Sequence, residues 1–396
     1  MTRLVKMLFI NPNARVNRDI PNIGLAYAAT HYNVRVIDLH TVPSPEDRFL
    51  QYQTDILGIS VQSRTLNESI RIAEMYKAKY PEAKIKSISG FLDVQCCYPY
   101  LDLQDKISYK EPFSDSYPFP NFELFDSFHL FRENWRSGTW SYAIMTSQGC
   151  PYQCIYCASR NRKWRPRSAE NCFEELKLAK ERWQIKSFQI LDDCFNIDKG
   201  RVIKFCELIK SLRLNWFCTN GVRADRFDED IAKAMSGSGC RHVSFGIESV
   251  FPDVLQAIRK GETIERIEKA IDIARNYFRS VNGFFIIGLP KSSYEKDLYS
   301  LKWAVRKGIN AHFSYYIPHD KLIQSSPLFY GEGAGPVSDE YPKEMQKKIY
   351  DMTEYMRPSR HRNLLKRGLL GLKLIWMFDR HNLPKHLAYD LKRFIR

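Results

Sequence analysis

Two patterns of apolar and polar residues alternate along the first 112 residues of the chain. Short apolar runs typical of buried strands are KMLFINPN, VRVIDLH, DILGISVQS and KIKSISGF. Between them lie stretches with helical spacing, IGLAYAATHY, PEDRFLQYQ and LNESIRIAEMYKAKYP. Strands that alternate with helices at this interval predict a doubly wound parallel sheet, so residues 1–112 are expected to form a reduced Rossmann-like α/β domain.

The alternation resumes beyond residue 140. Ser168 can cap a helix over SAENCFEELKLAKERW, whose apolar residues recur at helical spacing. Strands are predicted at 187–193, 216–219 and 283–290, and the last is apolar almost throughout, as a strand buried on both faces would be. The further elements predicted are a helix over 228–235, a strand ending at 246–249, a helix over YEKDLYSLKWAVRKG and a strand in INAHFSYYIPHD.

Two segments depart from this alternation. PFSDSYPFPNFELFDSFHLF holds three prolines and many aromatic residues, which predicts an extended linker over residues 113–139. Residues 326–396 are predicted to be a basic helical region, in which RNLLKRGLLGLKLIWMFDRHNL interleaves cations with apolar residues at helical spacing. Such a helix either packs its apolar face on the protein or lies on an anionic membrane surface, and the sequence leaves both open.

The composition is that of a soluble protein of two or three domains. The chain has 396 residues, 44% of them apolar, and no apolar run approaches the roughly 18 to 20 residues that span a bilayer. It opens with no signal-peptide pattern, and ten cysteines without secretory features are typical of reducing cytoplasm, so we expect a cytoplasmic protein. The net charge of +15 permits contact with anionic partners but specifies none.

The stretch richest in chemical information is GCPYQCIYC, residues 149–157. Cys150, Cys154 and Cys157 form a C-x3-C-x2-C array, and three thiolates suit a cubane iron–sulfur cluster whose fourth iron stays open to an outside ligand. Structural zinc would need a fourth protein ligand, and no further Cys or His lies close by in the sequence. A zinc loop and three unrelated buried cysteines remain as alternatives to the cluster.

This spacing resembles the defining motif of the radical S-adenosylmethionine (SAM) superfamily. The resemblance implies a 4Fe-4S cluster on the three cysteines, with the open iron chelating the amino and carboxylate groups of SAM. It also implies that Tyr156 packs near the adenine of SAM. The six strand–helix units over residues 140–325 would then form a partial (β/α)6 barrel with an open side.

Residues further along resemble the parts of that superfamily that hold SAM. The segment SFQILDD resembles the F-x-D-D segment of cobalamin-type members, which implies that Asp192 and Asp193 lie near the ammonium group of SAM. A solvated loop with an aspartate capping the next helix is the alternative. GIES, which begins at Gly246, resembles the fourth barrel strand, whose terminal acid, here Glu248, bonds the ribose hydroxyls.

The same resemblance assigns a cation and a glycine to the cofactor. The superfamily uses a cation for the SAM carboxylate about three turns beyond the fourth strand, where this chain has Arg259 and Lys260. The sequence does not decide which of the two faces inward, and the other is expected to be an exposed helix-end cation. GFFIIGLP resembles the fifth strand, where a terminal glycine lets the adenine approach the backbone, so Gly288 is the candidate.

The N-terminal domain, placed ahead of a radical SAM domain, resembles the cobalamin-binding domain of the cobalamin-type (class B-like) subfamily. Asp38 and His40 match only part of the Asp-x-His-x-x-Gly motif that supplies a lower axial histidine, because the glycine is absent. The end of the domain, SGFLDVQCCYPYLDLQDKISYKEP, is also shortened. Two interpretations therefore remain open: the domain binds cobalamin, or it only packs on the barrel. The adjacent thiols Cys96 and Cys97 are a weaker candidate for an auxiliary site.

The resemblance implies an enzyme that cleaves SAM with one electron, supplied by a reductant of the flavodoxin or ferredoxin type. The resulting 5′-deoxyadenosyl radical would abstract hydrogen from an unactivated C–H bond. With bound cobalamin the expected outcome is C-methylation. Without cobalamin it would be rearrangement, cyclisation, epimerisation or C–C coupling.

The substrate, a small molecule, lipid or peptide, is not specified by the sequence. The basic run RNRKWRPR, residues 160–167, could meet an anionic substrate. Methylthiolation of transfer RNA would suit the positive charge, but that family needs a second cysteine triad and a C-terminal β-barrel that this sequence lacks, so nucleic acid is not expected. A metal-binding scaffold without activity would leave the ordered series DD, GIES and GLP unexplained.

Overall fold

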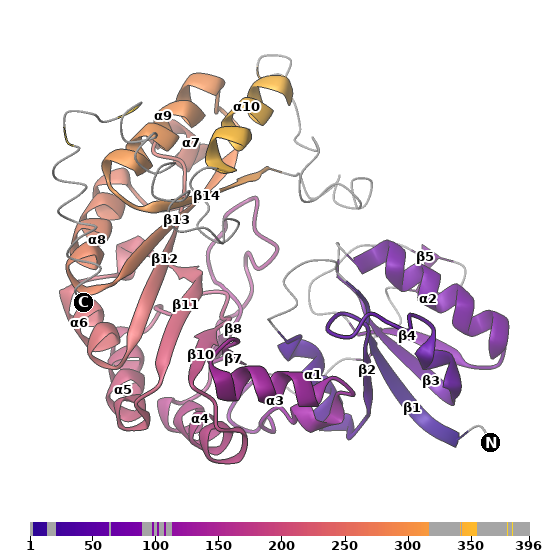
Figure 1. Cartoon of the computed structure of the whole chain (residues 1–396). Helices are drawn as coiled ribbons and strands as arrows, with labels where there is room; N and C mark the ends of the chain where they lie inside the picture. The colour runs from indigo at the N-terminus through magenta and orange to yellow at the C-terminus, as the bar shows by residue number, and fades with distance from the viewer. Residues whose placement is uncertain are drawn as a thin grey trace. The chain divides into compact units, whose positions relative to one another are not determined.

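The computed structural model divides into two compact units (Figure 1). It describes residues 3–13, 21–62, 65–88, 97–98, 101–102, 107, 113–316, 341, 343–354, 378 and 382. Of these, the first unit comprises residues up to 146 together with 165–189, and the second comprises 147–164, 190–316 and the described residues from 341 onward.

A four-stranded parallel sheet forms the centre of the first unit. Its order is β2-β1-β3-β4, and the strands are β1 (Arg3–Asn11), β2 (Val36–Asp38), β3 (Tyr52–Ser60) and β4 (Lys84–Ile88). The crossovers are helix α1 (Ile23–Tyr32) and helix α2 (Leu66–Lys79). Because such crossovers are right-handed and leave β1 and β3 in opposite directions, the two helices cover opposite faces of the sheet (Figure 1).

These elements confirm all four strands expected in residues 1–112 and two of the three helical stretches. The third stretch, PEDRFLQYQ, is wrong as a helix, since only the 3-10 turn η1 (Arg48–Gln51) forms there. Strand β3 begins at Tyr52, so too few residues remain for a stable α-helix. A two-residue hairpin of β5 (Cys97–Tyr98) and β6 (Leu101–Asp102) is described nearby, whereas the side chain of Cys97 and all of Cys96 lie outside the described residues.

Residues 113–139 differ from the extended linker predicted for them. They contain the 3-10 turn η3 (Phe122–Leu124) and the helix α3 (Phe128–Ser137), which ends at Gly138 in the left-handed conformation, φ 79°. The prolines lie before this helix and therefore do not interrupt it. The helix forms because Phe131 and Trp135, one turn apart, are both fully buried.

Four aromatic side chains pack around Trp135 in the first unit. The ring centroid of Trp135 lies 5.2 Å from that of Phe122, 5.3 Å from Tyr142 and 5.7 Å from Trp183. Phe131 stacks on it at 5.6 Å. This cluster joins α3 to strand β7 (Tyr142–Ile144) and to helix α4 (Ala169–Trp183), so it ties the segment expected to be a linker into the core.

The second unit repeats a strand and a covering helix (Figure 1). Parallel strands β11 (Asn215–Val222), β12 (Cys240–Glu248), β13 (Ser280–Ile287) and β14 (Asn310–Tyr315) pair in chain order. The helices are α5 (Lys199–Ile209), α6 (Glu229–Gly237), α7 (Pro252–Ala257), α8 (Ile264–Tyr277), α9 (Tyr294–Arg306) and α10 (Lys343–Glu354). The remaining short elements of this unit are β8 (Ser147–Gln148), η4 (Lys210–Leu212) and η5 (Ala224–Arg226). Strand β9 (Arg165–Pro166) and all but the last residue of β10 (Ser187–Ile190) belong to the first unit.

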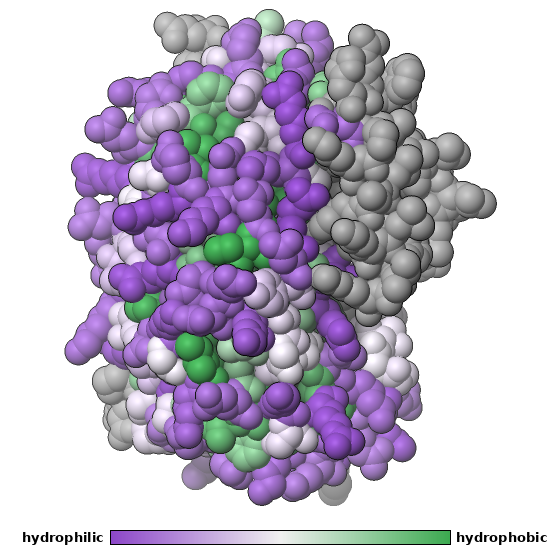
Figure 2. Space-filling model, turned by 90° about the vertical axis from the view of Figure 1, so that its left-hand side faces the viewer, coloured by the Kyte–Doolittle hydropathy of each residue, from purple (hydrophilic) through white to green (hydrophobic). Residues whose placement is uncertain are grey.

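These parallel strands and helices confirm the mixed α/β architecture expected of residues 140–325, and α4 begins where predicted. The Ser168 side chain accepts a hydrogen bond from the backbone N–H of Asn171 at 3.1 Å. The strand expected at 187–193 ends earlier, at Ile190. The helices α5, α6 and α8 present a mainly hydrophilic surface with scattered apolar residues (Figure 2). No helix in the described part of the chain is long and apolar enough to cross a bilayer.

The aromatic cluster around Trp135 leads to a stability prediction. Replacing Trp135 by Ala should lower the free energy of unfolding of the first unit by about 3 to 5 kcal/mol, because it empties a fully buried site. Chemical denaturation followed by circular dichroism measures the change. Glu133→Ala, an exposed position on the same helix, is the control and should change stability by less than about 0.5 kcal/mol. Equal effects of the two substitutions would contradict this account of α3.

Candidate functional site

The three motif cysteines lie on one loop that follows strand β8 in the second unit. Gly149 starts this loop with φ 86°, and a Cβ atom there would lie 2.3 Å from the backbone oxygen of Lys163. Only glycine fits this position, since the conformation and the close approach both exclude a side chain. The backbone N–H of Cys157 donates to the Cys154 oxygen at 3.1 Å, which turns the loop so that its last two cysteines are neighbours.

Asp193 fixes both ends of this cysteine loop, residues 149–159. One carboxylate oxygen accepts from the backbone N–H of Gly149 at 2.7 Å, and the other accepts from the hydroxyl of Ser159 at 2.6 Å. Asp192, which is 1% exposed, accepts from the hydroxyl of Ser147 at 2.7 Å. The two acids predicted to lie near the SAM ammonium group thus hold the cysteine loop and the strand before it.

The thiols differ in how burial and neighbours affect their pKa values. Burial raises the pKa of Cys157 to about 11 and also raises the pKa of Cys154. The pKa of Cys150 is lowered, chiefly by a hydrogen bond from the thiol of Cys194, whose own pKa rises accordingly. In iron-free protein Cys150 is therefore the thiol most easily ionised.

Cys194 is a neighbour that the sequence reasoning missed. It is 3% exposed and its thiol lies against Cys150, although no fourth cysteine or histidine was expected near the motif. The signal was present, because Cys194 directly follows Asp193, whose carboxylate binds Gly149.

The donor set of the loop fits an iron–sulfur cluster by its chemistry. Three soft thiolates on one short segment suit iron, and the backbone N–H of Ser159 points to the Cys157 sulfur at 3.4 Å, a contact that stabilises ligated sulfur. Among the described residues no three His, Cys, Asp or Glu side chains already converge as a metal cage.

A buried ion pair lies at the end of strand β12. Glu248 accepts a hydrogen bond from the hydroxyl of Tyr156 at 2.9 Å, and the Lys260 ammonium lies 3.2 Å from the same oxygen. The second carboxylate against Lys260 belongs to Glu262, at 3.3 Å. Burial alone would lower the pKa of Lys260, but these two carboxylates raise it above its usual value, so Lys260 stays protonated.

This geometry shows which cation faces inward. Lys260 is 6% exposed, whereas Arg259 is exposed and has φ 53°. Gly246 makes room for the ion pair, because a Cβ atom there would lie 2.8 Å from the Glu248 carboxylate and 2.9 Å from the Lys260 ammonium. Gly288 has φ 76°, and a Cβ atom there would lie 3.0 Å from the amide oxygen of Gln346.

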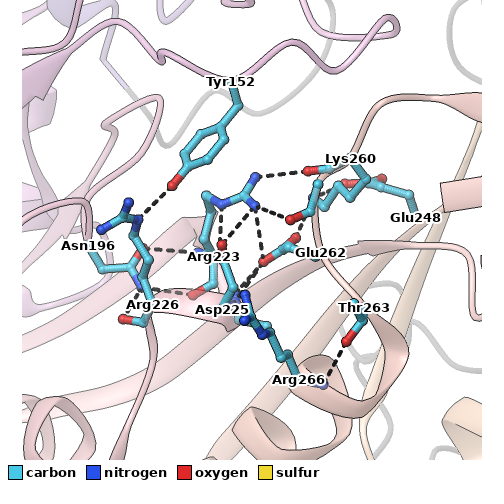
Figure 3. Close-up of polar contacts among 12 residues, drawn as sticks. Tyr152, Asn196, Arg223, Asp225, Arg226, Glu248, Lys260, Glu262, Thr263 and Arg266 are labelled. Carbon is cyan, nitrogen blue, oxygen red and sulfur yellow. Dashed lines mark hydrogen bonds and ion pairs between the residues drawn. The ribbon is translucent and has the colours of Figure 1, made fainter. Parts of the chain in front are cut away.

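Arg223 joins the cysteine loop to this ion pair (Figure 3). Its guanidinium lies 3.4 Å from the ring centroid of Tyr152, which stands between Cys150 and Cys154. The same group binds Asp225 at 2.9 Å and the backbone oxygen of Lys260 at 3.2 Å. It is 6% exposed, so this contact is shielded from water.

Glu262 completes the ionic network shown in Figure 3, which also went unpredicted. One oxygen of Glu262 accepts from the backbone N–H of Ala224 at 2.7 Å. The network as a whole holds three carboxylates and two cations, namely Asp225, Glu248, Glu262, Arg223 and Lys260. Counted over these five side chains, three negative and two positive charges leave one net negative charge.

The match to known proteins begins at the strand before the cysteine loop. Residues 144–304 match the profile of the Radical SAM superfamily, so this segment, which includes the three-cysteine loop, is a radical SAM domain.

Two curated relatives are methyltransferases by name. An uncharacterized methyltransferase of Pyrococcus horikoshii is 36% identical over 180 residues, 44% of this chain and 39% of the relative. Cytidylyl-2-hydroxyethylphosphonate methyltransferase of Streptomyces wedmorensis is 30% identical over 185 residues, 44% of this chain and 35% of the relative. The chain thus spans well under half the length of these relatives.

Solved structures resemble the chain over a longer span. The radical SAM methyltransferase TsrM from Kitasatospora setae, with cobalamin and a [4Fe-4S] cluster bound, superposes with a TM-score of 0.62 and 16% identity. The match covers 97% of this chain and 90% of that one. The cobalamin-dependent radical enzyme OxsB matches with a TM-score of 0.60 and 18% identity, over 87% of this chain and 56% of that one. At these identities the likeness concerns the fold alone.

The buried position of Lys260 can be tested by a matched pair of substitutions. Lys260→Met should lower the free energy of unfolding by about 3 to 5 kcal/mol, because it leaves Glu248 and Glu262 without their cation. Arg259→Met removes the neighbouring exposed cation and should have an effect below about 0.5 kcal/mol. Urea unfolding measures both, and a larger loss for the Arg259 variant would reverse the assignment.

The thiol environments predict an order of alkylation in iron-free protein. As pH rises, Cys150 should react with iodoacetamide first, and Cys157 should become reactive only toward pH 11, because only thiolates attack. Peptide mass spectrometry at a series of pH values measures each rate. Cys194→Ala should move the Cys150 profile to higher pH, and an unchanged profile would show that Cys194 does not donate to it.

Proposed function

We propose that the chain is a cobalamin-dependent radical SAM enzyme that methylates an unactivated carbon. The observation that carries this is the assembly of the three-cysteine loop, the Tyr156–Glu248 hydrogen bond and the buried Lys260 within one unit. Cluster and SAM would together supply a radical able to abstract hydrogen, and cobalamin would supply the methyl group. The methyltransferase names of the relatives support this reaction type.

The residues of the second unit have distinct roles in this proposal. Cys150, Cys154 and Cys157 hold the cluster, while Asp193 keeps both ends of their loop in place. Arg223 packs its guanidinium against the ring of Tyr152 and so supports the loop. This packing would exclude water from the cysteine loop.

Glu248 and Lys260 are proposed to hold the polar groups of SAM, and Tyr156 and Gly288 to lie against its adenine. Glu248 can accept two hydrogen bonds from a ribose diol, and Lys260 can pair with the SAM carboxylate. SAM carries a sulfonium and an ammonium group against one carboxylate, so it is a net cation. The single negative charge left over in the buried network favours such a ligand.

Cobalamin is proposed to bind the first unit at the carboxyl ends of its strands. The order β2-β1-β3-β4 places a switch point between β1 and β3, where doubly wound sheets bind ligands. Small polar side chains gather there, since the Asn22 amide donates to Ser60 at 2.9 Å and the Asn11 amide donates to Asp38 at 2.8 Å. The buried carboxylate of Asp38 also accepts a hydrogen bond from the hydroxyl of Ser127. Asp38 is therefore not available to orient an axial histidine such as His40.

The shortened end of the domain, residues 89–112, lies largely outside the described residues. The segment RNLLKRGLLGLKLIWMFDRHNL of the basic C-terminal region, residues 362–383, lies outside them too, apart from Phe378 and Asn382. The proposal also includes peripheral contact with an anionic membrane and a small-molecule, lipid or peptide substrate.

The cluster assignment is tested by replacing the three cysteines together. After anaerobic reconstitution, C150A/C154A/C157A should bind no iron and form no 5′-deoxyadenosine, while the unchanged protein should hold about four irons. Replacing the buried thiols Cys172, Cys206 and Cys240 by Ala is the control, and it should leave the iron content unchanged. Full iron retention in the loop variant would overturn the proposal.

The same preparations separate the cobalamin part of the proposal from the rest. Unchanged protein incubated with cobalamin and passed through a desalting column should keep the visible absorbance of a bound corrinoid. An iron-loaded protein that cleaves SAM but retains no corrinoid would refute methylation through cobalamin and leave a cobalamin-independent radical reaction.

A further inference from the structure

The cysteine loop continues directly into a run of cations that is hydrogen-bonded to it. The backbone N–H of Arg162 donates to the carbonyl oxygen of Cys150 at 3.0 Å, and the backbone N–H of Arg160 donates to that of Cys157 at 3.3 Å. Between them, the backbone N–H of Asn161 donates to Tyr152 at 2.9 Å. The basic segment, residues 160–163, is thus attached to the backbone of two of the three proposed cluster ligands.

The basic segment is rich in cations and has no acidic residue of its own. Arg160 and Lys163 are exposed and Arg162 is half-buried. No Asp or Glu occurs from residue 147 to residue 164. Asp193, one of the acids that contact the cysteine loop, is occupied with Gly149 and Ser159. A fourth cation joins from η5, because exposed Arg226 donates to the Tyr152 hydroxyl at 2.6 Å (Figure 3).

Arg167, at the far end of the same sequence run, does not belong to this surface. It is 1% exposed and forms an ion pair with Glu175 at 2.6 Å inside the first unit. The run RNRKWRPR therefore divides into an exposed basic segment next to the cysteines and a structural arginine. A single anionic site along the whole run does not form.

We propose that the basic segment, with Arg226, is the docking surface for an acidic one-electron donor protein of the flavodoxin or ferredoxin type. This rests on the proposed function, since it requires a cluster on the three cysteines. Such a cluster must receive one electron from outside for each reductive cleavage of SAM. The donor loses one electron and the cluster gains one, so the transfer needs no other reactant.

The position of the segment suits this role for two reasons. A protein seated on residues 160–163 would touch chain that is one hydrogen bond away from Cys150 and Cys157, which keeps the electron path short. Clustered cations also raise the association rate of an anionic protein by roughly 10- to 1000-fold, with a strong dependence on salt. A small anionic substrate would not need this external surface. Its binding would also not make the rate of cluster reduction depend on salt in this way.

The test compares two reductants on the iron-loaded enzyme. One is an acidic flavodoxin in its fully reduced form, and the other is photoreduced 5-deazariboflavin, a small uncharged molecule that needs no docking surface. The variant is R160E/R162E/K163E. The control is K233E/R266E/K269E, which makes the same change of six charge units on the exposed sides of α6 and α8. Stopped-flow absorbance and electron paramagnetic resonance follow reduction of the cluster.

Reduction by flavodoxin at low ionic strength should slow at least about tenfold in the loop variant and much less in the control. At roughly 0.5 M salt the difference from unchanged protein should shrink, because the charges are screened. Reduction by deazariboflavin should be the same in all three proteins, which shows that the cluster is intact.

Three results would overturn the proposal. Equal flavodoxin rates for the loop variant and unchanged protein would show that the cations serve another anion. Equal losses in the two variants would show that only total charge matters. A loop variant that loses its reduction by deazariboflavin as well would show that the segment holds the cluster rather than docks a partner. Failure of unchanged protein to form any reducible cluster would instead refute the proposed function on which this surface depends.

Discussion

The carboxylate of Asp193 accepts one hydrogen bond from each end of the loop that carries the three cysteines. Without it, a segment with few helical or strand hydrogen bonds would have many conformations to lose on binding a cluster. The clamp works because Gly149 can adopt φ 86° and brings its N–H toward the acid. Strand β10 ends at Ile190, shortly before Asp192 and Asp193, whose carboxylates bind Ser147 and the cysteine loop.

Buried charge near this loop is arranged for positioning rather than for stability. An ion pair such as Glu248 with Lys260 gains little over apolar packing, because both groups lose their hydration. Its value lies in fixing the Tyr156 hydroxyl, and with it the loop, against the end of β12. Arg223 does the same from the end of β11 through the ring of Tyr152. Three strand ends and one loop are thereby fixed in position relative to one another, as a cofactor that contacts all of them requires.

Features encoded by local spacing could be predicted from the sequence. Ser168 caps α4 because its partner is only three residues away, and the cysteine motif is local too. Contacts between distant residues could not be predicted in this way. Cys194 lies against Cys150 only once the strands are assembled, and the choice between Arg259 and Lys260 depends on a left-handed turn at Arg259. No sequence period encodes either.

The segment 113–139 illustrates the opposite error. Its prolines suggested an extended chain, but a proline restricts only the residues beside it. The helix α3 begins beyond them and is stabilised by burying Phe131 and Trp135 among aromatic residues that come from other elements. Tertiary packing of this kind overrides a compositional pattern, and composition alone carries no information about it.

Opposite signs of charge in the second unit give one cysteine loop two different surroundings. The buried network beside Tyr156 has one more carboxylate than cations, whereas the basic segment after Cys157 has cations and no carboxylate of its own. The buried network favours a cationic cofactor, and the basic segment repels it. An acidic protein is attracted by the basic segment and repelled by the buried network. Because both charge groups are bonded to the same loop, each partner would meet the cysteines through the surroundings that suit its charge, and neither would compete for the other's place.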